Sequence, residues 1–334
     1  MSTASLRTAA AAVPVLLGAA GPALAQRMQS AVDARGPAAA DIAFIWWIML
    51  GGGIAIFIGV LSLLLYGLLA RRRPAVRGHR VFVIGGGLVF PGIVLSALLV
   101  YTVIVGARLT AGPPDDALVI DVTGHMWWWE VRYAGPDGAA LASANELRIP
   151  VGRAVHLRVH SADVIHSFWV PNLAGKMDMI PGRVNRLDIQ ADAPGTYRGQ
   201  CAEFCGQQHT LMALHVVAMP QAEWERWFAR GRGEVAAPVT QVALRGREVF
   251  TDAGCVACHA VRGLSAPPPG LGPDLTHMGS RPSIGAGLLP NNRGNLVAWI
   301  SAAQSLKPGN GMPSFHHLDG ASLDALAAWL SGLQ

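Results

Sequence analysis

Two long apolar stretches without a charged side chain, separated by an arginine-rich loop, limit what this chain can fold into more than any other feature. They cover residues 42–70 and 81–105. Each is long enough for a helix that crosses the hydrocarbon core of a bilayer. The composition agrees, because hydrophobic residues make up 51% of the 334 residues and charged residues only 14%. We therefore predict a transmembrane hairpin over residues 41–107.

The loop between the two stretches sets the predicted orientation. Five arginines lie within residues 71–80: Arg71, Arg72, Arg73, Arg77 and Arg80. Such a run also fits a nucleic-acid patch or a solvated loop, but nothing else in the sequence suggests nucleic acid as a partner. Between two membrane spans it favours a cytoplasmic loop, by the positive-inside rule. Everything after Ala107 is then expected on the periplasmic, outer face of the cell inner (plasma) membrane.

Residues 1–25 have the organisation of a signal peptide. Arg7 supplies a positive charge, residues 9–20 are apolar, and Ala23-Leu24-Ala25 forms a cleavage signal before Gln26. The alternative is an uncleaved first membrane helix. The apolar run is short and rich in alanine, which favours cleavage.

Residues 113–230 are predicted to form a β-domain. Short segments with the composition of strands alternate with clusters of Gly, Pro, Asp and Asn. Many short strands over about a hundred residues suggest a Greek-key sandwich or barrel. The predicted strands include residues 118–122, 127–133, 146–150, 154–159 and 184–189, and a helix at residues 221–230 follows them.

The rest of the chain is predicted to be helical with long loops. Residues 231–240 are interpreted as a loose linker, and residues 241–334 as a separate domain. Helices are expected at residues 242–253, 295–303 and 322–333.

The segment from Gln200 to Met212 carries a set of soft metal ligands. It contains the thiols of Cys201 and Cys205, the imidazole of His209 and the thioether of Met212. A local disulfide is the alternative for a cysteine pair in an exported protein. Sulfur with imidazole selects copper or zinc, and a thioether is a poor zinc ligand but a good weak axial copper ligand. Two thiolates four residues apart can bridge two coppers, so we predict a dinuclear copper site.

A second histidine is needed to complete this site. His166 is the best candidate, because it lies at a strand end upstream of the cysteine loop, where copper sandwich proteins supply their first histidine. His160 stays open as the alternative ligand. His156 and His215 are interpreted as structural histidines.

The motif Cys255-Val256-Ala257-Cys258-His259 is a c-type haem attachment signature. Both thiols would add to the haem vinyl groups, and His259 would be the proximal ligand. The alternative is a chance match or a disulfide beside a histidine. Export, a helical domain and a downstream methionine argue against it. The Pro273 carbonyl is expected to orient the His259 ring.

Two methionines compete for the distal position on the haem, where a thioether raises the reduction potential. Met312 lies in a rigid loop from Lys307 to Pro313, just before the last predicted helix, and we favour it. Met278 is the alternative. His277, a further candidate ligand, is interpreted as structural.

The copper motif resembles that of a known family. Residues 163–168, with Cys201-x-Glu203-x-Cys205-x3-His209-x2-Met212, look like the dinuclear copper A (CuA) motif of cytochrome c oxidase subunit II. The two membrane spans and the aromatic run at residues 124–129 match that family too, so the resemblance covers about residues 40–230.

The last part of the chain extends this resemblance. Residues 272–281, Leu289-Pro290-Asn291, Trp299 and the Met312 loop resemble the cytochrome c domain fused to subunit II in caa3-type oxidases. The implied fold is multidomain. It has a two-helix transmembrane hairpin, an all-β cupredoxin-like Greek-key domain and an all-α cytochrome c domain.

The resemblance also implies roles for individual residues. The Glu203 carboxylate resembles the residue that reaches a magnesium ion at the junction with subunit I. Trp127 aligns with the tryptophan through which electrons enter from cytochrome c, with core packing as its alternative role. The implied CuA ligands are the side chains of His166, Cys201, Cys205, His209 and Met212 and the main-chain carbonyl of Glu203.

The implied function is that of the subunit through which electrons enter a respiratory haem–copper terminal oxidase. Electrons from cytochrome c or the bc1 complex would pass through haem c and CuA to haem a and CuB in subunit I, where O2 is reduced to water with proton translocation. The cofactors would be two copper ions and one covalently bound haem c, and the partners subunits I and III and membrane lipid.

Two other functions stay open at this point. One is the corresponding subunit of a CuA-type nitric oxide reductase, because the terminal acceptor belongs to the partner. The other is a free-standing electron shuttle or copper-delivery protein. The membrane hairpin and Glu203 argue against the second, since both fit docking to a large subunit.

The chain departs from the family at one position. The family often carries a glutamate near the start of the second span, at the mouth of a proton pathway, and the corresponding residue here is Ile84. No Asp or Glu occurs between Asp41 and Asp115. Proton uptake would use another residue, with His79 as a weak candidate, or another subunit.

Overall fold

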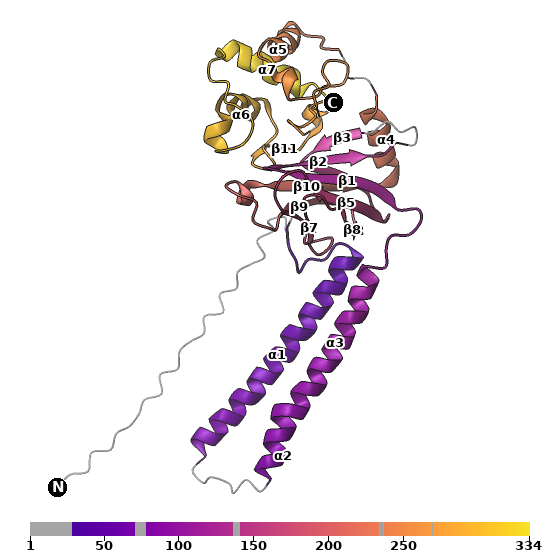
Figure 1. The fold of residues 1–334 in the computed structure, drawn as a ribbon, viewed down its shortest axis with the longest axis vertical. Helices are drawn as coiled ribbons and strands as arrows, with labels where there is room; N and C mark the ends of the chain where they lie inside the picture. Colours follow the sequence, from indigo (N-terminus) through magenta and orange to yellow (C-terminus); the bar gives the residue numbers. More distant parts are fainter. Residues whose placement is uncertain (1–28, 71–77, 136–140, 234, 236, 269) are drawn as a thin grey trace, which may run out of the picture.

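The computed structural model describes residues 29–70, 78–135, 141–233, 235, 237–268 and 270–334. The predicted signal peptide and four of the five loop arginines lie outside these residues, and Arg80 lies within them. Figure 1 shows three parts: a pair of long helices, a β-domain at one end of that pair, and a helical part on the far side of the β-domain.

The two predicted membrane spans are helices. Helix α1 covers Pro37–Leu69, and the second span is one helical rod made of α2 (His79–Ile84), a π-helical turn (Gly85–Val89) and α3 (Phe90–Leu109). The two rods run side by side (Figure 1), and the rings of Phe44 and Tyr101 lie 6.1 Å apart between them. Both are long and apolar enough to cross a membrane, and their side chains are almost entirely exposed. Such surfaces are stable only against lipid or other apolar helices.

The π-helical turn coincides with the glycine run and proline of the second span. The Phe90 N–H bonds to the Gly85 carbonyl, one residue farther back than in an α-helix. Pro91 follows directly, and it has no N–H to continue the α-helical pattern. The wider turn lets the helix pass the proline without a break, so the span continues to Leu109.

The residues before α1 attach the hairpin to the β-domain. The Arg35 N–H donates to the Asn172 carbonyl at 2.7 Å, and the Asn172 side-chain amide donates to the Asp33 carbonyl at 2.8 Å. A Cβ at position 36 would overlap the Gln190 carbonyl oxygen, so Gly36 is needed for this close approach. The hairpin is therefore held to the domain by these hydrogen bonds and by the close approach at Gly36.

The β-domain consists of two five-stranded sheets. All neighbouring strands are antiparallel except β1–β5 and β4–β10, which are parallel. The first sheet has the order β3 (Leu141–Ala144), β2 (Trp128–Tyr133), β1 (Leu118–His125), β5 (Val155–Ser161) and β8 (Asn185–Ile189). The second has the order β4 (Glu146–Pro150), β10 (Ala213–Met219), β9 (Gly195–Cys201), β6 (His166–Trp169) and β7 (Met177–Met179).

One hydrophobic core lies between these sheets and includes Val122, Trp129 and Leu214, all fully buried. The five predicted strands are present, four of them with shifted ends, and the two sheets form a sandwich, one of the two predicted architectures. Trp127 is an exception, because it lies in the turn before β2 rather than in the strand. Trp129 packs in the core, as ordinary burial predicts, while Trp128 stacks on His125 with ring centroids 4.4 Å apart.

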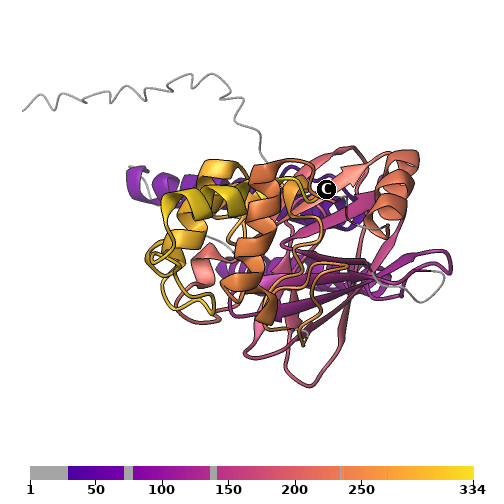
Figure 2. The same cartoon turned by 90° about the horizontal axis from the view of Figure 1, so that it is seen from above.

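The C-terminal part is helical, as predicted. Helix α4 (Gln221–Gly231) ends the β-domain, and α5 (Gln241–Asp252), α6 (Arg293–Leu306) and α7 (Gly320–Ser331) surround a second hydrophobic core. A short hairpin of β11 (Ser283–Ile284) and β12 (Leu289–Pro290) precedes α6. Figure 2 shows these orange to yellow helices gathered over one side of the β-domain.

Helices α5 and α7 cross at very close range. A Cβ at Gly246 would overlap the Ala325 carbonyl oxygen, so no larger residue fits at this crossing. Next to it, the rings of Phe250 and Trp329 pack 4.9 Å apart. Phe250 of α5 and Leu326 and Leu330 of α7 line one wall of a pocket.

Candidate copper and haem sites

The second sheet brings the predicted copper ligands together. His166 begins β6 and Cys201 ends β9, and these neighbouring strands pair through Phe168 and Cys201. The chain then forms a loop that returns to β10, with His209 in a short 3-10 turn. The Cys201 N–H donates to the Met212 carbonyl at 2.9 Å, which closes the loop.

The predicted ligand atoms gather around the two buried cysteine sulfurs. The two sulfurs of Cys201 and Cys205 are 3.7 Å apart, and Nδ1 of His166 lies 3.8 Å from the Cys201 sulfur. On the other side, Nδ1 of His209 and the Met212 sulfur lie 3.7 Å and 3.9 Å from the Cys205 sulfur. The arrangement has one imidazole beside each thiol, so these side chains would be able to hold a pair of copper ions.

The charge of the cysteine pair also favours cations here. A hydrogen bond with Cys205 lowers the pKa of the Cys201 thiol to about 3, and the same contact raises the pKa of Cys205. The pair therefore retains one proton, because two thiolates at this distance repel each other in a buried site. Metal ions that replace the proton would stabilise both thiolates. The donor set of thiolate, imidazole and thioether fits copper.

Asp163 orients one of the ligands, a role that the sequence analysis did not assign. Its carboxylate lies 2.8 Å from Nε2 of His166, so Nδ1 is left to face the cysteines. The other carboxylate oxygen accepts a 2.7 Å hydrogen bond from the Met126 N–H. Burial lowers the pKa of His166, but bonds with Cys201 and Asp163 more than offset this and raise it.

The remaining histidines of the β-domain lie elsewhere. Nε2 of His160 lies 3.1 Å from the Thr123 hydroxyl, and Nδ1 of His156 lies 2.5 Å from the Asp188 carboxylate. His215 contacts the Ser283 hydroxyl at 3.2 Å. The structure places none of these three side chains with the two cysteines, and this favours His166 as the upstream ligand.

The main-chain carbonyl and the side-chain carboxylate of Glu203 lie in different surroundings. Its carbonyl oxygen lies 3.2 Å from the Cys201 sulfur, within the predicted copper site. Its carboxylate is about half exposed and lies 3.4 Å from the Lys176 ammonium. The carboxylate is therefore on the surface beside the copper loop, where a second protein chain can reach it.

Trp127 connects the copper loop to the helical part of the chain. Its indole Nε1–H donates to the Cys205 carbonyl at 2.8 Å. On its other side, the indole packs close to Gly309, in the loop that carries Met312. A Cβ atom added to Gly309 would lie 3.7 Å from the indole ring. Trp127 also lines a pocket between the β-domain and the C-terminal domain.

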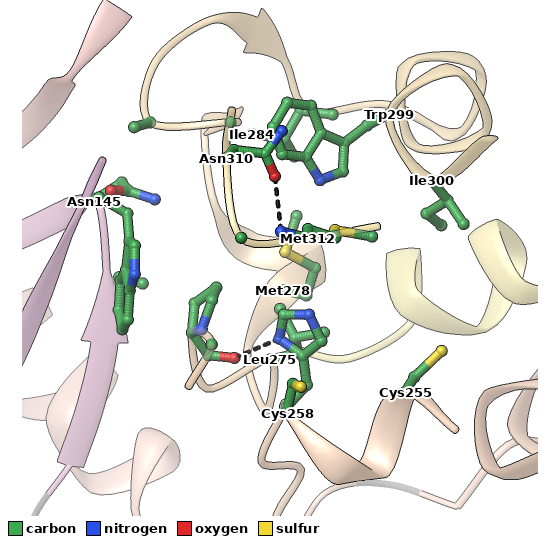
Figure 3. Close-up of a pocket in the computed structure, with 18 of the residues that line it drawn as sticks. Asn145, Cys255, Cys258, Leu275, Met278, Ile284, Trp299, Ile300, Asn310 and Met312 are labelled. Atoms are coloured by element: carbon green, nitrogen blue, oxygen red, sulfur yellow. Dashed lines mark hydrogen bonds between the residues drawn. The ribbon is translucent and has the colours of Figure 1, made fainter. Parts of the chain in front are cut away.

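That pocket contains the haem attachment motif. It is lined by Cys255, Cys258 and His259 and by both candidate methionines, Met278 and Met312. Figure 3 shows the two cysteines at one end of the pocket and the methionines farther along it, beside Trp299. The pocket walls are mainly apolar, which suits a haem macrocycle.

The proximal histidine has the expected partner. Nδ1 of His259 lies 2.9 Å from the Pro273 carbonyl, as predicted, so Nε2 is left free for a metal. Burial lowers the pKa of His259, which keeps the imidazole neutral and ready to bind. A Cβ at Gly272 would lie 3.0 Å from the imidazole, so a glycine is suited to this close approach.

The two methionines differ in their surroundings. The Met278 sulfur is buried and lies 3.8 Å from a guanidinium nitrogen of Arg281. The Met312 backbone is fixed by Asn310 and Gln304, whose side chains bond to its N–H at 2.8 Å and to its carbonyl at 2.7 Å. These contacts favour Met312 as the distal ligand. His277 bonds to the Gly231 carbonyl and does not line the pocket, as expected for a structural histidine.

Comparisons with known proteins agree with both sites. The family profile described as "Cytochrome C oxidase subunit II, periplasmic domain" matches residues 136–219, and that described as "Cytochrome c" matches residues 243–334. "Cytochrome c oxidase subunit 2" of Bacillus sp. strain PS3 is 32% identical over 262 residues, with 74% of this chain and 72% of that protein covered. The chain belongs to the cytochrome c oxidase subunit II family.

Other members of the cytochrome c oxidase subunit II family align over less of their length. The protein of the same name from Alkalihalophilus pseudofirmus is 40% identical over 220 residues, which are 66% of this chain. The chain spans 62% of that relative and 63% of the one from Bacillus subtilis. A crystal structure of the periplasmic domain of subunit II from Bradyrhizobium japonicum matches at 30% identity and a TM-score of 0.34, over 36% of this chain and 97% of that one.

Family membership confirms the resemblance to subunit II with a fused cytochrome c domain. A copper domain and a haem domain follow from the two matched families. The individual ligands stay predictions that the geometry above supports.

Proposed function

We propose that this chain is the subunit through which electrons enter a caa3-type haem–copper terminal oxidase. When bound, haem c and the CuA pair supply one-electron redox chemistry, and they would pass electrons from cytochrome c or the bc1 complex to haem a and CuB in subunit I. There O2 would be reduced to water with proton translocation. The chain's own residues bind the two centres, exclude water from them and set the distance between them.

The observation that carries this proposal is the shared boundary of the two sites. Trp127 bonds to the Cys205 carbonyl and also lines the pocket that holds His259 and Met312. One side chain therefore touches the predicted copper loop and the predicted haem pocket. A shuttle with two unrelated centres would have no need for this contact.

Further contacts support a fixed arrangement of the two domains. The Gln208 side chain donates to the Pro308 carbonyl at 2.7 Å, and the Ala213 N–H donates to the Ala286 carbonyl at 3.0 Å. Both join the copper loop, or the strand after it, to the haem domain. An electron donor would then dock on the haem domain, because that domain already occupies the Trp127 side of the copper site.

The membrane arrangement follows from the hairpin. We place both metal domains on the periplasmic, outer face of a multi-pass chain, with subunits I and III against the exposed apolar helices. The exposed Glu203 carboxylate would reach a magnesium ion at the subunit I junction. Proton uptake would depend on partner subunits, since Ile84 occupies the position of the family glutamate.

A CuA-type nitric oxide reductase would use the same two sites. The name shared by the curated relatives favours the oxidase, and oxygen uptake by the purified complex decides between the two. Uptake of nitric oxide but not of oxygen would overturn the oxidase proposal.

Ligand variants test the site assignment in that complex. Cys201→Ser and Cys205→Ser should each abolish the delocalised mixed-valence copper signal and its near-infrared band while haem c stays attached. The reciprocal variant His259→Ala should change the haem spectrum and leave the copper band intact. A copper signal that survives both serine variants would show that the ligand assignment is wrong.

A further inference from the structure

One buried lysine lies at the boundary between the two domains. Lys307 is 2% exposed, and its ammonium donates to three main-chain carbonyls: Trp127 at 2.9 Å, Leu211 at 2.9 Å and Gly285 at 3.0 Å. An ammonium has three N–H donors, so all of them are used. None of the ion pairs among the described residues includes Lys307, so the three carbonyl dipoles are the direct partners of the charge, with the Cys205 sulfur as a further favourable electrostatic neighbour.

The three acceptors belong to different parts of the molecule. Trp127 and Leu211 are in the copper domain, and Leu211 directly precedes the predicted ligand Met212. Gly285 follows β11 in the haem domain, and Lys307 directly follows the last residue of α6, where the Met312 loop begins. The ammonium therefore joins the ligand loop of one centre to the ligand loop of the other.

Burial of a charge costs free energy unless polar groups around it compensate for the lost hydration. Desolvation of an unpaired ammonium costs several kcal/mol, and an apolar residue would avoid that cost. Here the three carbonyls offset part of the desolvation cost, because hydrogen bonds from a charged donor are about twice as strong as neutral ones. Lysine also suits this geometry better than arginine, since a compact ammonium can point its donors in three directions, whereas a guanidinium is planar.

We propose that Lys307 is a positioning residue for electron transfer inside this chain, and that its charge fixes the haem domain against the copper loop. This inference rests on the proposed function for its redox part. In each transfer one ferrous haem c would become ferric and the copper pair would gain that electron, so no other reactant would be needed. The positive charge beside the copper loop also favours the reduced copper pair and raises its potential.

The test uses the full chain in the intact complex. Lys307→Met keeps the length of the side chain but removes the charge and all three donors. We expect both centres to remain loaded, the midpoint potential of the copper pair to fall, and haem-to-copper transfer to slow roughly tenfold, the factor that about 1.4 kcal/mol of barrier produces. Lys307→Arg should retain most of the copper potential, because it keeps the charge.

Arg262 provides the matched control. Its guanidinium also crosses the domain boundary and donates to two carbonyls, of Gly231 and Gly233, both at 2.7 Å, but neither lies beside a metal site. Arg262→Gln should leave the copper potential and the transfer rate unchanged. Equal effects of the Lys307→Met and Arg262→Gln variants would show that Lys307 is only one of several domain contacts.

A second readout is independent of electron transfer. A protease site inserted at the exposed Val239 allows the two domains to be separated after cleavage. The haem fragment should stay bound to the copper domain in the parent chain and dissociate at least roughly tenfold more readily with Lys307→Met, as expected for lost charged hydrogen bonds. Equal retention would overturn the positioning role. Absence of internal transfer in the parent chain would instead overturn the proposed function.

Discussion

The indole nitrogen of Trp127 donates a 2.8 Å hydrogen bond to the carbonyl oxygen of Cys205, one of the two cysteines of the predicted copper site. Trp127 lies in the turn between β1 and β2, so it belongs to the first sheet, whereas Cys205 lies in a loop of the second. The bond links the two sheets at the edge of the domain that faces the haem pocket.

Trp127→Phe removes this hydrogen bond and keeps an aromatic ring. We expect the copper signal to persist and transfer between haem and copper to slow by about tenfold, equivalent to roughly 1.4 kcal/mol in the barrier. Rapid-reaction absorption of the intact complex measures this rate. Trp227→Phe, in α4 and away from both sites, is the control. If both variants transfer at the parent rate, Trp127 has no part in the route.

Asp163→Asn removes the carboxylate that faces Nε2 of His166. We expect copper affinity to fall by about 10- to 100-fold, as in other sites that lose the partner of a ligating histidine. Copper content after dialysis against a chelator gives the measurement. Asp188→Asn is a matched control, because Asp188 pairs with His156 away from the site. A parent-like affinity in the Asp163 variant would show that His166 needs no orienting partner.

Met312→Ala and Met278→Ala distinguish the two candidate distal ligands. Loss of a thioether ligand lowers the haem potential and changes the spin state. We expect both changes with Met312→Ala and neither with Met278→Ala, while the copper band stays the same in both. Redox titration and optical spectra of the haem provide the test, and the opposite pattern would assign Met278 as the ligand.

Glu130 should make the β-domain less stable in acid. Burial by itself raises the pKa of this carboxyl, but the His125 imidazole 3.6 Å away and a hydrogen bond from Arg132 outweigh it and lower the pKa. A carboxyl with a lowered folded-state pKa stabilises the fold above its unfolded value, and this is lost as the pH falls through the folded value.

Thermal unfolding of Glu130→Gln and the parent chain checks this effect. The variant should melt a few degrees lower at pH 7. This difference should narrow as the pH falls and close below the lowered folded-state pKa of Glu130, once the parent carboxyl is protonated too. The exposed Glu248→Gln serves as control. A difference that stays constant with pH would mean that Glu130 acts through packing rather than charge.

The features that could be predicted from the sequence are those whose residues lie close together along the chain. The hairpin follows from uncharged length, and the haem motif from Cys255, Cys258 and His259. The ligands Cys201, Cys205, His209 and Met212 lie within one loop, so chain connectivity alone keeps them near one another. His166 required more, because it is brought to the loop only by the pairing of β6 with β9.

The parts that could not be predicted depend on contacts between distant segments. Strands β9 and β10 flank the copper loop, yet their apolar patterns are short and their pairing is visible only in the folded sheet. Asp163 looks like an ordinary loop acid until the fold places it against His166. The position of Lys307 could not be predicted for the same reason, since its three backbone carbonyl partners come from separate parts of the chain.

The most direct test of the central claim is a single-turnover measurement on the purified complex. Haem c is reduced rapidly in the absence of oxygen, and the haem band and the near-infrared copper band are followed together. If electrons pass within the chain, haem oxidation and copper reduction proceed one to one, with one rate constant that does not depend on protein concentration. A copper band that does not respond, or a rate that rises with concentration, would contradict electron transfer within the chain.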